Sequence, residues 1–196
     1  MAALSLEEEI RTLFQQRRVA YDDHSDSFNR LDFGFGDRAA KRYFVFDAKE
    51  KRQPYAVSNW QTTIPEAHLF ILDDLACRKI LLYAPNAGLL VRDTPQQRYI
   101  FFSVVDLFLM PKSRVNRAIH RTQAEQKGKW LIDLRNGYTL PRLDELFATI
   151  DGYLDQRQAI FHEIHECYGE YVGEEIGTGG IERRPEHWET DFGATR

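Results

Sequence analysis

Cysteine is scarce in this sequence, which contains only Cys77 and Cys167 among its 196 residues. Two cysteines so far apart are not typical of a small secreted domain held by disulfides, and they favour a reduced, cytoplasmic protein. Long hydrophobic runs are also missing, because charged residues break every apolar stretch within a dozen positions. The start of the chain, MAALSLEEEI, has no basic residues followed by an apolar block. We therefore expect neither a signal peptide nor a membrane contact.

The sequence has no surplus of positive charge either, since its formal net charge is −4. That value alone argues against nucleic acid as a partner, because phosphate contacts need lysine and arginine. The charge is unevenly distributed, however: residues 163–196 hold nine acidic and three basic residues and carry −6, which leaves +2 for residues 1–162. Position along the chain therefore matters more than the sum.

Two stretches, 38–52 and 111–129, concentrate the basic residues. We predict that they supply the nucleic-acid contacts, and the candidate residues are Lys51, Arg52, Lys112, Arg114, Arg117 and Arg121. The alternative is that both stretches are solvated faces of the protein. The predicted partner is DNA, including structured nucleic acid, and the sequence leaves a homodimer open.

Length and composition predict one sizeable core rather than two domains. With 43% hydrophobic and 29% charged residues, we expect a single α/β domain over residues 1–172. Residues 173–196 are rich in Gly, Glu, Arg and Thr, and we expect an acidic, loosely ordered tail or a segment that orders against a partner.

Hydrophobic periodicity gives a coarse order of elements. Ser5 and Glu8 form a capping-box signal before an amphipathic helix over 6–18. Two alternating segments, 31–37 and 42–51, predict a β-hairpin or meander after a short strand over 19–23. The remaining expected elements are a buried helix over 65–83, strands over 89–93, 99–109 and 130–135, and a long helix from Pro141 to about Tyr168.

Three polar residues fall within the predicted hairpin. Asp32 lies on its first strand, and Asp47 and Lys49 are two positions apart on the second. Because side chains alternate along a strand, Asp47 and Lys49 share a face, and pairing of the two strands would bring Asp32 beside them. Two carboxylates are what Mg²⁺ takes from a protein when it also binds water and phosphate. The alternative is an exposed ion pair on a hairpin.

At these residues the chain resembles the PD-(D/E)XK, restriction-endonuclease-like nucleases, and the order of helix, strand, Asp, spacer and acidic-x-Lys is similar to that of archaeal Holliday-junction resolvases. The resemblance implies a central mixed sheet flanked by helices and hydrolysis of DNA phosphodiester bonds with Mg²⁺ or Mn²⁺. It makes Asp32 and Asp47 the metal ligands and Lys49 a catalytic residue. The sequence departs from the pattern in having Leu31 before Asp32 and Asp, rather than the commoner Glu, at position 47.

The same resemblance implies that a Glu of the first helix points into the metal site, and Glu7 is the candidate because it borders the buried face. The alternative is that Glu7, Glu8 and Glu9 only stabilise the N-terminus of the helix against its macrodipole. For the chain as a whole, the alternative to a nuclease is a non-catalytic module of the same fold that binds nucleic acid or protein.

Overall fold

The computed structural model describes residues 4–118 and 126–157. The chain divides into two units, Met1–Asp151 and Gly152–Arg196, and the first contains two sheets. The strands are β1 (Tyr21–Asp23), β2 (Phe33–Phe35), β3 (Phe44–Lys51), β4 (Leu69–Asp73), β5 (Ala87–Asp93), β6 (Arg98–Ser103), β7 (Ser113–Ala118), β8 (Gln126–Asp133) and β9 (Tyr138–Leu140). The α-helices are α1 (Leu6–Arg17), α2 (Asp74–Leu82) and α3 (Val104–Leu109), and residues 146–157 are also helical.

Short 3₁₀ turns join several of these elements, at Val57–Asn59, Thr94–Gln96, Leu134–Asn136 and Leu143–Glu145. In the described ranges, none of the helices has the length and apolar composition needed to cross a bilayer.

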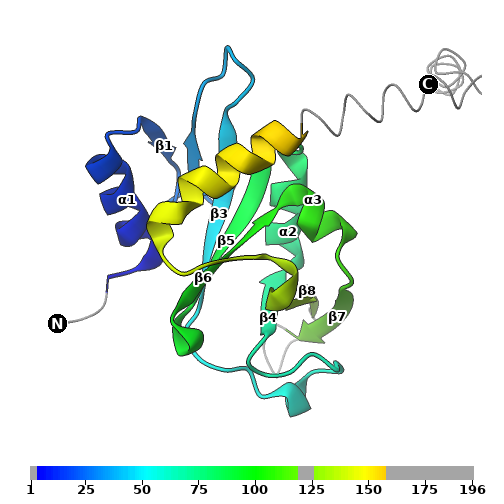
Figure 1. The fold of residues 1–196 in the computed structure, drawn as a ribbon. Coiled ribbons are helices and arrows are strands. Elements are labelled where there is room, and N and C mark those ends of the chain that lie inside the picture. Colours follow the sequence, from blue (N-terminus) through cyan, green and yellow to red (C-terminus); the bar gives the residue numbers. More distant parts are fainter. Residues whose placement is uncertain (1–3, 119–125, 158–196) are drawn as a thin grey trace, which may run out of the picture. The chain divides into compact units, whose positions relative to one another are not determined.

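The larger sheet is mixed, with strand order β1-β2-β3-β5-β6-β9. β3 and β5 pair in parallel, and the other neighbours pair antiparallel. The parallel pair needs a long crossover, which the chain makes through β4 and α2 (Figure 1). The predicted mixed α/β sheet flanked by helices is therefore present.

Helix α1 packs on one face of this sheet. Ser5 and Glu8 form the predicted capping box, and Leu6, Ile10 and Phe14 are fully buried. Phe14 stacks near Phe33, which neighbours Phe46. Phe147 also packs against Phe14. An aromatic layer thus fixes α1 against the side of β3 that carries Phe46.

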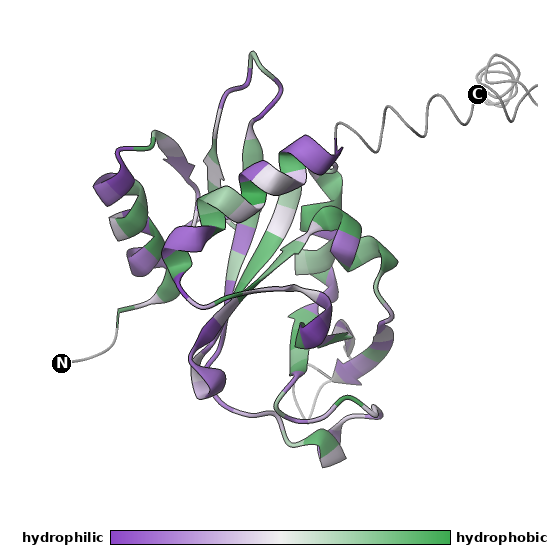
Figure 2. Ribbon diagram, in the orientation of Figure 1, coloured by the Kyte–Doolittle hydropathy of each residue, from purple (hydrophilic) through white to green (hydrophobic). Residues whose placement is uncertain are grey.

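The opposite face of the larger sheet meets α2 and a second cluster of buried residues. These include Cys77 and Ile80 from α2, Leu89 and Val91 from β5, and Phe102 from β6. In Figure 2 the strand β5 is mostly hydrophobic, whereas the second half of β3 is hydrophilic. The second half of β3 therefore places polar residues next to the mostly hydrophobic strand β5.

Two predicted elements are correct over part of their length and change type within it. Residues 65–83, predicted as one helix, form β4 followed by α2, because the apolar run Leu69–Leu72 pairs with β8 in a second sheet of order β4-β8-β7. Residues 99–109, predicted as a strand, turn at Ser103 into α3. There Ser103 and Asp106 form a capping box at the start of the helix.

The smaller sheet is a finding that the sequence did not predict. Its β7–β8 hairpin, in which the two strands pair antiparallel, includes the described residues of the basic stretch 111–129. Of the long C-terminal helix, the structure describes residues 146–157, so its predicted end near Tyr168 and the predicted tail 173–196 lie outside the described residues.

Candidate active site

The β2–β3 register brings Asp32 and Asp47 together. Phe33 pairs with Phe46, so Asp32, one residue before β2, falls beside Asp47 on the same face. The backbone N–H of Ala48 donates a 2.8 Å hydrogen bond to Asp32 Oδ2, which fixes this carboxylate against β3. Asp32 is 7% exposed and Asp47 is fully buried. Two carboxylates therefore meet in a largely dry site.

Lys49 completes the group from the same face of β3. Its Nζ lies 2.7 Å from Asp47 Oδ2 and 3.5 Å from Asp32 Oδ2, and it donates a 3.1 Å hydrogen bond to the carbonyl oxygen of Ala48. The Lys49 side chain is 37% exposed, far more than either carboxylate. The structure thus places all three predicted residues in contact, with the ammonium nearest to solvent.

The pKa values of two members shift because of this arrangement. Burial, and then the neighbouring charge of Asp47, raise the pKa of the Asp32 carboxyl above its ordinary value. Burial works to lower the pKa of Lys49, but the Asp47 and Asp32 carboxylates outweigh it, and the pKa of Lys49 is raised. Lys49 is therefore an ammonium at neutral pH.

Asp47 has unused coordinating capacity. Among the described residues neither of its carboxylate oxygens accepts a hydrogen bond, although both are buried. Its charge is balanced by the Lys49 ammonium, whose Nζ lies 2.7 Å from Oδ2. A buried carboxylate without hydrogen bonds is costly unless another group satisfies it.

Mg²⁺ or Mn²⁺ fits this donor set. Asp32 and Asp47 supply hard oxygen ligands on one face, and Asp47 has two oxygens to offer. No group of three or more His, Cys, Asp or Glu with metal-site geometry occurs within 4–118 and 126–157. A cation held here would rely on the two carboxylates together with water and substrate oxygens, which is how Mg²⁺ commonly binds beside phosphates.

Lys79 is a member of the site that the sequence did not reveal. It comes from α2, donates a 3.1 Å hydrogen bond to the carbonyl oxygen of Arg30, and its Nζ is 3.9 Å from Asp47 Oδ1. Residue 79 lies inside the segment 65–83 that was predicted as a helix. Because the helix begins at Asp74 and not at residue 65, the sequence did not indicate which way the Lys79 side chain points. Two lysines therefore flank the buried Asp47.

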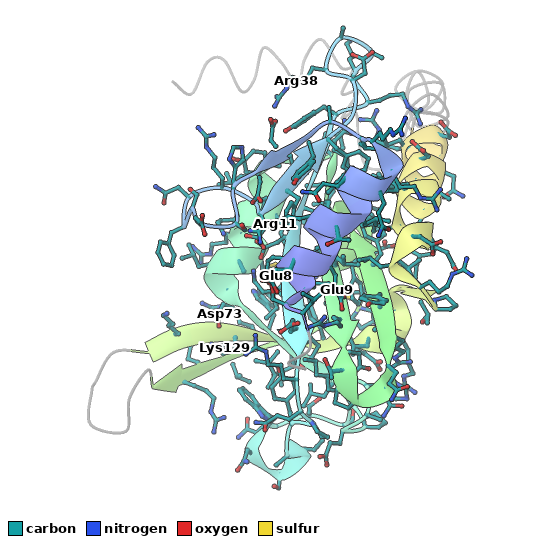
Figure 3. The ribbon with its side chains drawn as sticks, turned by 90° about the vertical axis from the view of Figure 1, so that its left-hand side faces the viewer. Glu8, Glu9, Arg11, Arg38, Asp73 and Lys129 are labelled. Atoms are coloured by element: carbon teal, nitrogen blue, oxygen red, sulfur yellow. The ribbon has the colours of Figure 1, made fainter. Side chains whose placement is uncertain are left out.

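Glu7 is not brought to the other three residues. Within the described part of the chain, no hydrogen bond or ion pair joins it to Asp32, Asp47 or Lys49. The acid of the first turn that engages the sheet is Glu9, which pairs with Arg92 at 2.7 Å and accepts a hydrogen bond from the Tyr99 hydroxyl at 2.9 Å. Figure 3 shows Glu9 on α1. Helix α1 packs on the face of β3 that carries Phe46, and Asp47 points to the other face because side chains alternate along a strand.

The two predicted phosphate contacts near β3, Lys51 and Arg52, differ in how exposed they are. Arg52 is exposed and pairs with Glu50. Lys51 is fully buried, donates hydrogen bonds to the carbonyl oxygens of Glu66 and Ala67, and lies 3.9 Å from Asp93. The prediction that Lys51 contacts nucleic acid is therefore wrong: its ammonium is turned inward because β5 places a buried carboxylate beside it.

Three of the other predicted basic residues, Lys112, Arg114 and Arg117, lie on or next to β7. Arg114 pairs with Asp74 at 3.2 Å, and Arg117 stacks 4.3 Å from the centre of the Trp60 ring. Lys112 donates a hydrogen bond to the carbonyl oxygen of Phe108. Arg121 lies outside the described residues. None of these residues contacts the Asp32–Asp47–Lys49 group among the described interactions.

No protein-family model and no curated protein match this chain. Two solved structures are similar to it. One is Hjc, a Holliday junction resolvase from the archaeal hyperthermophile Archaeoglobus fulgidus, at 12% identity and a TM-score of 0.40, covering 71% of this chain and 97% of that one. The other is D212, a nuclease from a fusselovirus, at 8% identity and a TM-score of 0.41, covering 77% and 88%.

Proposed function

We propose that this chain is a metal-dependent nuclease that hydrolyses phosphodiester bonds of DNA. The observation that carries the proposal is the fully buried Asp47, whose oxygens accept no hydrogen bond in the described structure, held beside Asp32 and Lys49. A structural ion pair on a hairpin would be solvated and would gain little by being buried. Buried carboxylates next to a lysine that reaches solvent suit a site that receives a cation and an anionic substrate.

The chain's own residues have distinct parts in this mechanism. Asp32 and Asp47 would hold Mg²⁺ or Mn²⁺, which when bound polarises the phosphoryl group and lowers the pKa of a coordinated water. The Ala48 N–H keeps the Asp32 carboxylate oriented through its 2.8 Å hydrogen bond. Burial of both carboxylates excludes bulk water, which strengthens their electrostatic interactions.

Lys49 would act as a donor rather than as a base, because the carboxylates raise its pKa. Its partly exposed ammonium can orient the attacking water or stabilise charge on a phosphoryl oxygen. Lys79, whose Nζ lies 3.9 Å from Asp47 Oδ1, adds a second positive charge next to the buried carboxylates.

The test is a comparison of Asp47→Asn and Asp32→Asn with the matched control Asp26→Asn, an exposed aspartate in the loop before β2. A cation at a hundred times its Kd stabilises a folded protein by about 2.7 kcal/mol. For a chain of this size that is a rise in Tm on the order of 5–10 °C. We expect the parent and the Asp26 variant to show this rise with Mn²⁺ and the other two to lose it.

Cleavage of plasmid and branched DNA in Mg²⁺ is then measured on the same proteins. Lys49→Met should keep the metal-dependent rise in Tm but cut at least about a hundredfold more slowly, the usual effect of removing a transition-state donor. An unchanged Tm response in both Asp32 and Asp47 variants would remove the metal site. A parent that binds Mn²⁺ and DNA without cutting would favour the non-catalytic binding module.

A further inference from the structure

A pocket of about 360 Å³ includes Val45, which lies two residues before Asp47 on β3. Its lining includes His24, Arg30, Arg38, Tyr43, Tyr83 and Asn86. These residues come from the loops on either side of β2, from the residues before β3 and β5, and from the end of α2. The site described above uses none of them.

Two backbone contacts join this pocket to the active site. The carbonyl oxygen of Arg30 accepts a hydrogen bond from Lys79, whose ammonium is also the neighbour of Asp47. The N–H of His24 donates a 2.7 Å hydrogen bond to the carbonyl oxygen of Asp32. The loop from 24 to 32 therefore begins at the pocket and ends at a predicted metal ligand.

Strand β3 runs from the pocket to the active site and sets the distance between them. Val45, which also lines the pocket, and Tyr43 continue the row of alternate residues that leads to Asp47 and Lys49. At about 3.3 Å per residue, Val45 is about 7 Å and Tyr43 about 13 Å from Asp47 along the strand. A DNA strand rises about 3.4 Å per nucleotide, so this interval corresponds to roughly two to four nucleotides.

The charge of the pocket favours an anion. Within the described residues no carboxylate pairs with Arg30, whose side chain instead lies 3.4 Å from His24 Nε2. Arg38 is 70% exposed and pairs with Asp22, a carboxylate that also accepts a hydrogen bond from the Tyr43 hydroxyl. The C-terminal end of α2 contributes only about half a negative charge. Among the described residues that line the pocket, Arg30 and Arg38 carry positive charge and none is acidic.

The wall of the pocket is fixed by packing. The Arg38 guanidinium stacks 3.6 Å from the centre of the Tyr43 ring, and Asn86 donates a 3.0 Å hydrogen bond to the Tyr43 carbonyl oxygen. Gly34 on β2 makes room for the ring, because a Cβ at this position would collide with the Tyr43 hydroxyl. Arg38, at the outer end of the β2–β3 loop in Figure 3, is thus held over Tyr43 before any ligand arrives.

We propose that this pocket binds a backbone phosphate of the DNA strand that is cut, a few nucleotides from the scissile bond. Arg30 and Arg38 are positioning residues whose planar guanidinium groups match the oxygens of a phosphate. They fix the register of the strand, and through it the bond that reaches Asp32, Asp47 and Lys49. This inference rests on the proposed function, since it assigns the path of the same substrate.

The experiment measures DNA binding by fluorescence anisotropy in a chelator, so that no cutting occurs, over a range of salt concentrations. Arg30→Gln is the main variant, because the Arg30 side chain pairs with no carboxylate of the described residues. Arg38→Lys keeps the charge of Arg38 but removes its fork. Arg17→Gln is the control, since it removes an exposed arginine of α1, on the other face of the sheet. Both pocket variants should weaken binding, Arg30→Gln by about tenfold, with its salt slope reduced by about one.

Cleavage of end-labelled DNA in Mg²⁺ gives the second readout. Loss of register should spread the cut over neighbouring positions in the pocket variants but not in Arg17→Gln, which a merely structural role would not produce. If the parent cuts DNA and both pocket variants bind and cut DNA as the parent does, the pocket does not bind the DNA strand. The proposed hydrolysis then still stands. A parent that binds DNA through Arg30 without cutting overturns the proposed hydrolysis and leaves the pocket standing. A parent that does neither overturns both.

Discussion

At the scale of single residues, the ionised carboxylate of Asp32 lowers the stability of the folded protein, because it is buried next to Asp47. Its carboxyl has a pKa above the ordinary value of 3.8, because burial and Asp47 disfavour its ionised form more than Lys49 favours it. A raised folded-state pKa means that the folded chain binds a proton more readily than the unfolded chain. Stability is therefore lost as pH rises from the unfolded pKa through the folded pKa, and the loss is complete above both.

Asp32→Asn should consequently stabilise the protein without metal. The amide oxygen of asparagine can still accept the Ala48 N–H, so the β2–β3 contact is kept while the charge is removed. Stabilising substitutions of this kind are typically worth about 0.5–2 kcal/mol. We expect a Tm a few degrees above the parent at pH 7 in a chelator, and a difference that disappears well below pH 3.8, where the parent carboxyl is protonated in both states.

Thermal melts at several pH values check this prediction, and Asp26→Asn serves again as the control. A Tm that falls at pH 7 would show that the Asp32–Lys49 ion pair contributes more than the buried charge costs. The site would then be built for stability rather than for receiving a cation.

At the scale of elements, the hairpin that carries the site could be predicted and the segment that covers it could not. Alternation in 42–51 fixes the faces of β3, and strand pairing then brings Asp32 to Asp47 and Lys49, because this contact is local in sequence. The boundary between β4 and α2 has no Gly or Pro to mark it. It depends on the pairing of β4 with β8, more than fifty residues away, and Lys79 was missed for that reason.

The β7–β8 hairpin carries basic residues of two kinds. Arg114 is compensated by Asp74, and Lys129 by Asp73, which Figure 3 shows side by side. Arg117 has no carboxylate partner in the described residues and lies against Trp60. Pairing reduces the charge that a phosphate meets, so the two arginines should differ in their contribution to DNA binding.

Arg117→Gln should therefore weaken DNA binding more than Arg114→Gln does. We expect a loss of several-fold and a salt slope smaller by about one for Arg117→Gln, and little change for Arg114→Gln. Equilibrium binding of one labelled duplex at several salt concentrations, with both variants checked for parental Tm, measures the difference. Equal losses would mean that Asp74 releases Arg114 to the DNA, and identity with the parent in both would leave the hairpin a solvated surface.

At the scale of the whole molecule, charge is segregated along the sequence. Residues 1–162 carry the candidate site and the pocket with a formal charge of +2, and residues 163–196 carry −6. The long-range field that a DNA molecule meets depends on the sum, while local contacts depend on position. Association at low salt should therefore be slower and weaker than the basic residues of the first part alone would allow.

Removing residues 174–196 should strengthen DNA binding at low salt. The deletion takes away six acidic and three basic residues and raises the formal net charge from −4 to −1. The gain should fade as the Debye length falls from about 30 Å at 0.01 M to about 8 Å at 0.15 M salt, because screening removes the distant repulsion. A chain of all 196 residues with three of the six acids changed to Gln or Asn has the same formal net charge of −1 and so separates charge from length. If both proteins gain affinity at low salt, the acidic segment opposes DNA through its charge. If only the truncated chain changes, and its Tm falls, the segment acts by packing on the rest of the protein, and the electrostatic explanation is wrong.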